Sequence, residues 1–119
     1  MLHEMTLFPK PYASIASGQK TIELRLYDEK RQSIQIGDQI RFTNTEDASQ
    51  ATLCEVVQLH VFKNFTKLYE NLPLLQCGYT SEDVDDAHPD DMLTYYSKEK
   101  QAQYGVVGIE LKRIKKTSL

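Results

Sequence analysis

Short stretches in which apolar and polar residues alternate constrain the fold of this chain more than any other feature. Residues 21–26 read Thr-Ile-Glu-Leu-Arg-Leu, and residues 105–112 place Val107, Ile109 and Leu111 at every second position. Strict alternation is typical of a strand with one buried face. Strands that flank a helical segment, instead of alternating with helices one by one, disfavour a doubly wound parallel sheet. We therefore expect an α+β, mainly β protein: a small mixed β-barrel of about five strands with flanking and inserted helices.

Two of the expected strands lie near the start of the chain. Residues 2–8 form a short strand candidate, and a turn signal at residues 37–38 leads into a strand that carries Ile40 and Phe42. Residues 46–50 then predict a hairpin-like loop.

Residues 52–62 form the longest strand candidate. Glu55 interrupts its apolar face, which predicts a bulge or an edge position. Alternation assigns that face to Leu53, Val57, Leu59 and Val61.

Capping residues mark the expected helices. Pro11 suits the first position of a helix, because its missing N–H would be unsatisfied there anyway, and Gly18 ends that helix. Asn64 is placed to cap a helix with a core-facing stripe, and Ser97 to cap a final turn running to Tyr104.

The size of the chain predicts a single domain over residues 1–119, because one hydrophobic core usually spans about 100–150 residues. No apolar run approaches the roughly 20 residues of a membrane helix, and the first residues do not resemble a leader peptide. We therefore expect a cytoplasmic protein without a membrane partner. Cys54 and Cys77 match no zinc spacing, so we expect reduced, buried thiols and no cofactor.

The formal net charge of −3 at first argues against a nucleic-acid partner, since such proteins are usually basic. Residues 82–91, however, carry six acids and no lysine or arginine, so the remainder of the chain carries +3. This distribution permits a local basic groove on a protein that is acidic overall. The role of the acidic stretch stays open.

The most informative segment is the charged strand around Glu23 and Arg25. These residues share one strand face with about 6.6–7 Å between their Cα atoms, and a turn at Gly18 can direct Lys20 to the same face. One interpretation is a solvated ion pair that contributes less than about 1 kcal/mol. The other is a ligand cleft in which the cations hold a phosphate or carbonyl oxygen and Glu23 accepts from an exocyclic amine.

Gly18, Lys20, Glu23 and Arg25 fill the four marked positions of GxKxxExR, the signature of the ASCH family, which this segment resembles. The resemblance extends to Ile36-Gly37-Asp38-Gln39-Ile40-Arg41-Phe42 and to Tyr104-Gly105-Val106-Val107-Gly108-Ile109. It implies a PUA-like β-barrel with a cleft that binds RNA or a modified nucleoside, lined by Lys20, Glu23 and Arg25, with Tyr104 as a further substrate-binding residue.

The resemblance also leaves a hydrolase open. One bacterial branch removes the acetyl group from acetylated cytidine with a Lys and a Thr of the signature and a later Glu, and ribonuclease activity is reported in the family. Here Lys20 matches the Lys, Glu23 stands where the Thr would be, and Thr21 is a hydroxyl at a different position. Lys20 and Glu23 are therefore the catalytic candidates if the chain is an enzyme.

Whether Glu23 recognises a ligand or acts as a general base depends on its pKa. Flanking cations lower the pKa of a carboxyl, which makes it a poor general base, whereas dominant burial would raise the pKa and permit water activation.

Three further features have competing interpretations. A metal at His88 and the neighbouring acids fits no known spacing, so we expect none. Tyr95 and Tyr96 are expected to pack rather than stack on a base, and the basic residues 112–116 are expected to be a solvated tail. A protein-interaction module remains the third function class, and the oligomeric state stays open.

Overall fold

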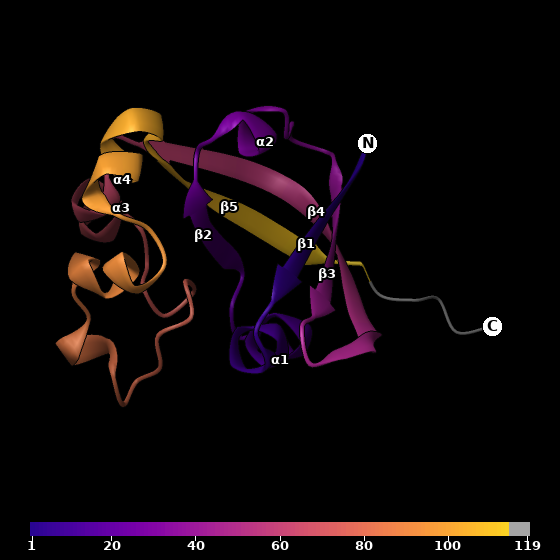
Figure 1. The fold of residues 1–119 in the computed structure, drawn as a ribbon. Coiled ribbons are helices and arrows are strands. Elements are labelled where there is room, and N and C mark those ends of the chain that lie inside the picture. Colours follow the sequence, from indigo (N-terminus) through magenta and orange to yellow (C-terminus); the bar gives the residue numbers. More distant parts are fainter. Residues whose placement is uncertain (115–119) are drawn as a thin grey trace.

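The structure is a computed structural model that describes residues 1–114. Its strands are β1 (Leu2–Leu7), β2 (Ile22–Leu26), β3 (Gln39–Asn44), β4 (Asp47–Phe62) and β5 (Val106–Arg113). They form one sheet in the order β1-β3-β4-β5-β2, in which β1 and β3 are parallel and the other pairs are antiparallel. The sheet curls into a half-barrel (Figure 1), which confirms the predicted mixed, mainly β architecture.

The helices flank the sheet or are inserted between strands. Helix α1 (Pro9–Ser17) follows β1, and the short α2 (Glu29–Gln32) follows β2. Between β4 and β5 the chain forms an insertion, residues 63–105. Figure 1 shows the insertion beside β2 and β5, and it contains α3 (Phe65–Asn71), the 3-10 turns η1 (Val84–Asp86) and η2 (Pro89–Thr94), and α4 (Lys98–Tyr104).

The sequence predicts most helix ends, because local side chains satisfy the backbone there. Gly18 takes a left-handed conformation with φ 88° and donates its N–H to Ile15. The side chain of Asn64 accepts from the N–H of Lys67 at the start of α3. Ser97 caps α4 in the same way. Helix α1 begins at Pro9, two residues before the predicted start, because Pro9 also tolerates the first helical turn.

Two clusters of buried apolar side chains lie on either side of β5, whose residues alternate between them. The barrel cluster lies inside the curled sheet and under α1: Met5, Leu7, Tyr12, Ile15, Ile34, Ile40, Phe42, Cys54, Val56, Val107, Ile109 and Leu111. The insertion cluster joins the sheet to residues 63–105: Ile22, Leu24, Leu26, Phe65, Leu68, Cys77, Met92 and Val106.

Strand β2 is covered on both faces. Its apolar residues belong to the insertion cluster, whereas Glu23 and Arg25 lie opposite Ile109 and Val107 of the barrel cluster. Directly opposed residues of an antiparallel pair point to the same side of the sheet. The charged face of β2 therefore turns towards the barrel interior and away from bulk water.

The predicted face of β4 is wrong except at Leu59, which packs against the barrel cluster. Cys54 and Val56 are fully buried, while Val61, expected inside, is 49% exposed. A register shift between Val56 and Gln58 supplies the predicted irregularity, two residues beyond Glu55. The polar residues 47–50 also extend β4 instead of forming a loop. Asp47 pairs with Asn44 and Ala51 pairs with Thr43, with a register shift between the two pairs.

Gly108, in the middle of β5, permits the close packing of the insertion on the sheet. A Cβ atom there would lie 2.6 Å from Leu72 Cδ1 and 3.1 Å from Ile22 Cγ2. We expect Gly108→Ala to lower the free energy of unfolding by about 1–3 kcal/mol through overpacking, measured by urea denaturation. In a Leu72→Ala background the same change should cost clearly less. An equal cost in both backgrounds would contradict this steric explanation.

Candidate ligand-binding site

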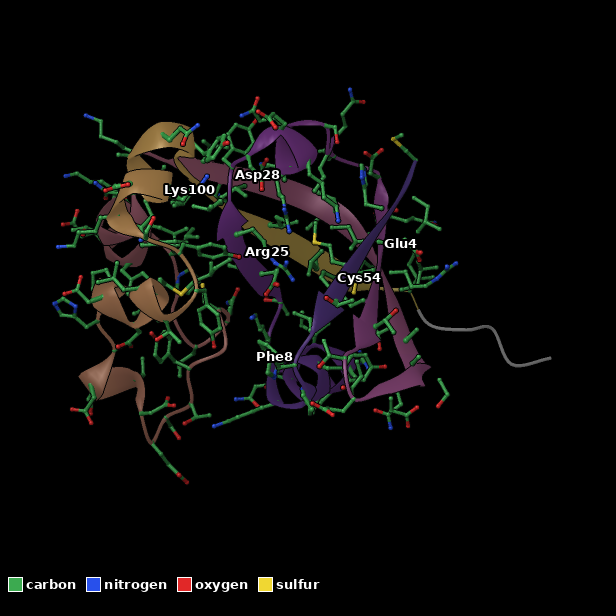
Figure 2. The ribbon with its side chains drawn as sticks, viewed as in Figure 1. Glu4, Phe8, Arg25, Asp28, Cys54 and Lys100 are labelled. Carbon is green, nitrogen blue, oxygen red and sulfur yellow. The ribbon has the colours of Figure 1, made fainter. Side chains whose placement is uncertain are left out.

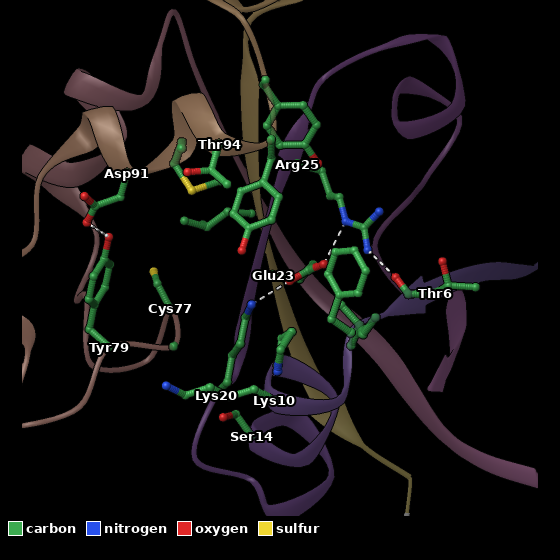
Figure 3. A pocket seen from close by; sticks show the side chains of 18 of the residues that line it. Thr6, Lys10, Ser14, Lys20, Glu23, Arg25, Cys77, Tyr79, Asp91 and Thr94 are labelled. Atoms are coloured by element: carbon green, nitrogen blue, oxygen red, sulfur yellow. Dashed lines mark hydrogen bonds and ion pairs between the residues drawn. The ribbon is translucent and has the colours of Figure 1, made fainter. Parts of the chain in front are cut away.

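The signature side chains meet around one carboxylate (Figure 3). Lys20 Nζ lies 2.7 Å from Glu23 Oε1, and Arg25 Nε lies 2.7 Å from Glu23 Oε2. Glu23 is only 3% exposed. Lys20, Glu23 and Arg25, here called the ionic triad, therefore form a buried constellation and not the solvated surface pair that composition alone permits.

The turn after α1 and a loop of the insertion position Lys20. After the left-handed Gly18, the N–H of Lys20 donates to the carbonyl of Ser14 at 3.0 Å. The stem of Lys20 then lies over Gly78, where a Cβ would be 3.3 Å from Lys20 Cδ and the φ of +116° favours glycine. The ammonium is thereby held against Glu23.

Arg25 connects the two edges of the sheet. Strands β1 and β2 are its end strands, and Arg25 Nη2 donates to the backbone carbonyl of Thr6 in β1 at 2.9 Å. Figure 2 shows Arg25 in the space between these strands. The ionic triad therefore lies at the open seam of the half-barrel.

The charges of the ionic triad hold Glu23 ionised. Burial by itself would raise the pKa of Glu23, but attraction and hydrogen bonds from Lys20 and Arg25 outweigh it, so the pKa lies below its ordinary value. With one carboxylate between two cations, the ionic triad carries a net charge of about +1 and suits an anionic or carbonyl-bearing ligand.

A pocket of about 500 Å³ opens above the ionic triad. Residues from the β1–α1 junction form one side, and residues of the insertion form the other. Phe8 and Tyr95 line it from these opposite sides and are 60% and 59% exposed. Such a volume suits one small-molecule or nucleoside-sized group, and exposed aromatic rings suit stacking on a flat ring.

The insertion contributes a hydrogen-bonded chain to the pocket wall. The hydroxyl of Tyr79 donates to Asp91 Oδ2 at 2.6 Å, and the hydroxyls of Tyr69 and Tyr79 are 2.7 Å apart. Sequence analysis missed these residues, and also missed Phe8 and Lys10 as lining residues. No local pattern could have found the insertion residues, because only its packing on β2 brings them to the pocket.

The remaining candidates lie away from the pocket or have other partners. Tyr104 does not line the pocket; its ring packs against the insertion cluster, with Lys100 Nζ 5.7 Å from the ring centre. Tyr96, expected to pack, does so against Phe65 but also lines the pocket. Arg113, assigned to a solvated tail, donates to the carbonyl of Ala16. Residues 115–116 of that tail lie outside the described residues.

Both cysteines are free and buried, as predicted. Burial raises the pKa of Cys77, which lines the pocket, to about 11, so its thiol is protonated at neutral pH. Within residues 1–114 we find no group of three or more His, Cys, Asp or Glu side chains that could hold a metal ion. His88 instead uses its ring to accept from the N–H of Asp90 and begins η2.

The family model of the ASCH domain matches residues 5–115. The chain belongs to the ASCH domain family. The ASCH family is PUA-like and is thought to bind RNA. No curated protein matches the chain.

Solved structures share the ASCH fold. The crystal structure of hypothetical protein PH0355 is 31% identical with a TM-score of 0.78, and the match covers 96% of this chain and 100% of that one. The solution structure of PF0455 from Pyrococcus furiosus is 30% identical with a TM-score of 0.73, covering 97% and 99%. ASCH from Zymomonas mobilis has a TM-score of 0.65 over 93% of this chain and 66% of that one, but at 12% identity it shows the fold alone.

No helix within the described part of this ASCH domain is long and apolar enough to cross a membrane.

Proposed function

We propose that this ASCH domain binds single-stranded RNA or a modified nucleoside in the pocket above the ionic triad. The observation that carries the proposal is a buried carboxylate that fixes two cations at the floor of a nucleoside-sized pocket. A solvated pair would not need this burial, and a purely structural pair would not need a pocket of about 500 Å³ beside it.

Each member of the ionic triad has a role in this proposal. Lys20 and Arg25 donate to a phosphate or carbonyl oxygen of the ligand, while Glu23 holds both cations in place. Arg25 uses Nε for Glu23 and Nη2 for Thr6, and its Nη1 has no hydrogen-bond partner within residues 1–114. That amino group is the donor we assign to the ligand.

The hydrolase alternative receives less support from the pocket. Thr21 is not among the lining residues, and its hydroxyl is 3.4 Å from Gln76 Oε1. The lowered pKa of Glu23 makes it a weak general base, and the raised pKa of Cys77 makes it a weak nucleophile. Recognition is therefore the function that this geometry supports best.

Salt-dependent binding tests the proposal. A short single-stranded RNA with a fluorescent label should bind the wild-type chain, and Lys20→Gln or Arg25→Gln should weaken binding about tenfold, since a charge-assisted hydrogen bond contributes about 1.5–3 kcal/mol. Each variant should also flatten the dependence of log Kd on log salt by about one phosphate contact.

Arg41→Gln is the matched control, because Arg41 lies on β3 outside the pocket and pairs with Glu4 on the surface. It should leave affinity and slope nearly unchanged. No binding of RNA or nucleosides by the wild type, or equal effects of Arg25→Gln and Arg41→Gln, would refute the proposal. If the wild type converts the RNA or the nucleoside into a product and Lys20→Gln abolishes this turnover, the protein is a hydrolase instead.

A further inference from the structure

The charges that line the pocket are separated into two sides. Lys10, Ser14 and Lys20 lie at one end, where Lys20 Nζ pairs with Glu23, and Figure 3 shows Tyr79 and Asp91 on a separate wall. Asp83 of the insertion is a further acid of the lining. The ligand therefore meets hydrogen-bond donors at one end of the pocket and a carboxylate at the other. A symmetric anion such as free phosphate would match only the donor end of the pocket.

The cationic end of the pocket offers hydrogen-bond donors from side chains more than from the backbone. Pro9 and Pro11 lack N–H groups, so the first turn of α1 offers few backbone donors to an anion. Within residues 1–114 neither the Lys10 ammonium nor the Ser14 hydroxyl has a hydrogen-bond or ion-pair partner, and both residues line the pocket. Together with the net positive ionic triad, they present donors of the kind that phosphate oxygens accept.

The opposite wall carries a carboxylate, Asp91, alongside the hydroxyls of Thr94, Tyr95 and Tyr96 and the thiol of Cys77. The single hydroxyl proton of Tyr79 is donated to Asp91 Oδ2, so in the pair of tyrosine hydroxyls Tyr69 is the donor. The N–H of His88 reaches the same Oδ2 at 3.2 Å. Asp91 Oδ1 accepts no hydrogen bond within the described residues, and hydrogen bonds from Tyr79 and His88 lower the pKa of Asp91, so the carboxylate is ionised at neutral pH.

An ionised carboxylate at this wall pairs best with a hydrogen-bond donor on the ligand. An exocyclic amino group, as on cytosine or adenine, donates to a carboxylate, whereas uracil and hypoxanthine present a carbonyl oxygen at the same position. That oxygen would face Asp91 with like partial charge and no bridging proton.

Building on the proposed function, we infer that the pocket binds a nucleotide with an amino-bearing base in one orientation. The phosphate lies at Lys10, Ser14 and Lys20, and the amino edge of the base donates to Asp91, which Tyr79 holds in place. Phe8 and Tyr95, exposed on opposite sides of the pocket, contact the faces of the base.

One set of binding measurements tests the phosphate contact and the base contact separately. Dissociation constants for CMP, UMP and cytidine are measured by calorimetry with the wild type, Lys10→Gln and Asp91→Asn. The wild type should prefer CMP over UMP about tenfold, in the range of a single base-edge contact, and CMP over cytidine about tenfold through the phosphate. AMP and IMP repeat the comparison for purines.

Asp91→Asn and Lys10→Gln should each reduce one preference and keep the other. Asp91→Asn replaces an acceptor by an amide that also donates, so CMP and UMP should bind within about twofold while CMP still exceeds cytidine. Lys10→Gln should reduce the preference for CMP over cytidine several-fold and leave the CMP to UMP ratio intact. Tyr79→Phe should weaken base discrimination in the same direction as Asp91→Asn.

Neighbouring and distant surface charges supply the controls. Asp90 precedes Asp91 but does not line this pocket, and Lys67 is exposed on α3, so Asp90→Asn and Lys67→Gln should change neither ratio. Thermal denaturation of every variant establishes that it is folded.

The outcomes distinguish this inference from the function on which it rests. Wild-type binding of nucleotides with equal affinity for CMP and UMP, or an unchanged ratio in Asp91→Asn, overturns the orientation while leaving nucleotide binding standing. A chain that binds none of these ligands and no RNA overturns both.

Discussion

Glu23→Gln is expected to lower the free energy of unfolding by about 3–5 kcal/mol at neutral pH. The exchange keeps the shape of the side chain but leaves Lys20 and Arg25, whose side chains are only 11% and 15% exposed, without a counter-charge. Removing one partner of a buried ion pair costs more than the pair itself contributes, because the remaining charges stay desolvated. Urea denaturation followed by circular dichroism measures the change.

A variant without any of the three charges tests this cause. Lys20→Met, Glu23→Leu and Arg25→Met combined should recover most of the stability lost in Glu23→Gln, because apolar side chains of similar size need no counter-charge. It should not recover ligand binding. Glu110→Gln, which breaks the more exposed pair with His60, is the matched control and should cost less than about 1 kcal/mol. A triple variant as unstable as Glu23→Gln would contradict the electrostatic explanation.

The pH dependence of stability provides a second readout. The pKa of Glu23 is lowered on folding, so the ionised carboxylate stabilises the protein above the pKa that it has in the unfolded chain. This contribution is lost as the pH falls through the lowered pKa of the folded state. The difference in stability between the wild type and Glu23→Gln should therefore be full at neutral pH and shrink in acid. A difference that stayed constant would exclude titration of Glu23 as its source.

Phe65→Ala is expected to cost about 3–5 kcal/mol, the usual range for removing a fully buried phenyl ring. Phe65 is 1% exposed at the centre of the insertion cluster, and its ring stacks on Tyr96 with 6.0 Å between centroids. Tyr96 also lines the pocket, so the cavity left by Phe65 should weaken ligand binding as well. Denaturation and calorimetric binding measure the two effects.

Phe8→Ala is the control, which is expected to weaken ligand binding without lowering the stability of the protein. Phe8 is 60% exposed, so its removal should change the free energy of unfolding by no more than about 0.5 kcal/mol. Because Phe8 lines the pocket, its removal should nevertheless weaken binding of a stacked base. A Phe65→Ala protein as stable as Phe8→Ala would show that the insertion does not depend on its apolar cluster.

Local sequence rules predicted the fold well wherever a short segment controls its own backbone. The caps at Asn64 and Ser97 and the left-handed Gly18 follow from which side chains satisfy free N–H groups and which residue tolerates a positive φ. The buried face of β4 did not follow, because the register shift after Val56 interrupts the alternation that the prediction extended along the whole strand.

The candidate site likewise contains residues that the sequence predicted and residues that it did not predict. The spacing of Lys20, Glu23 and Arg25 suggested that they converge, and their ion pairs bring them together. Tyr79 and Asp91 reach the pocket through packing of the insertion against β2, and Tyr104 packs elsewhere for the same reason.

The sequence by itself determined the mixed sheet, the helix caps and a strand with one charged face, because these depend on residue order over a few positions. Only the tertiary structure decided that the charged face is buried at the seam of a half-barrel, and that an acidic, aromatic wall stands opposite. The physical reason is that burial and pocket walls arise from contacts between segments far apart in the chain. Those contacts follow from how the apolar face of β2 is covered, which no local pattern specifies.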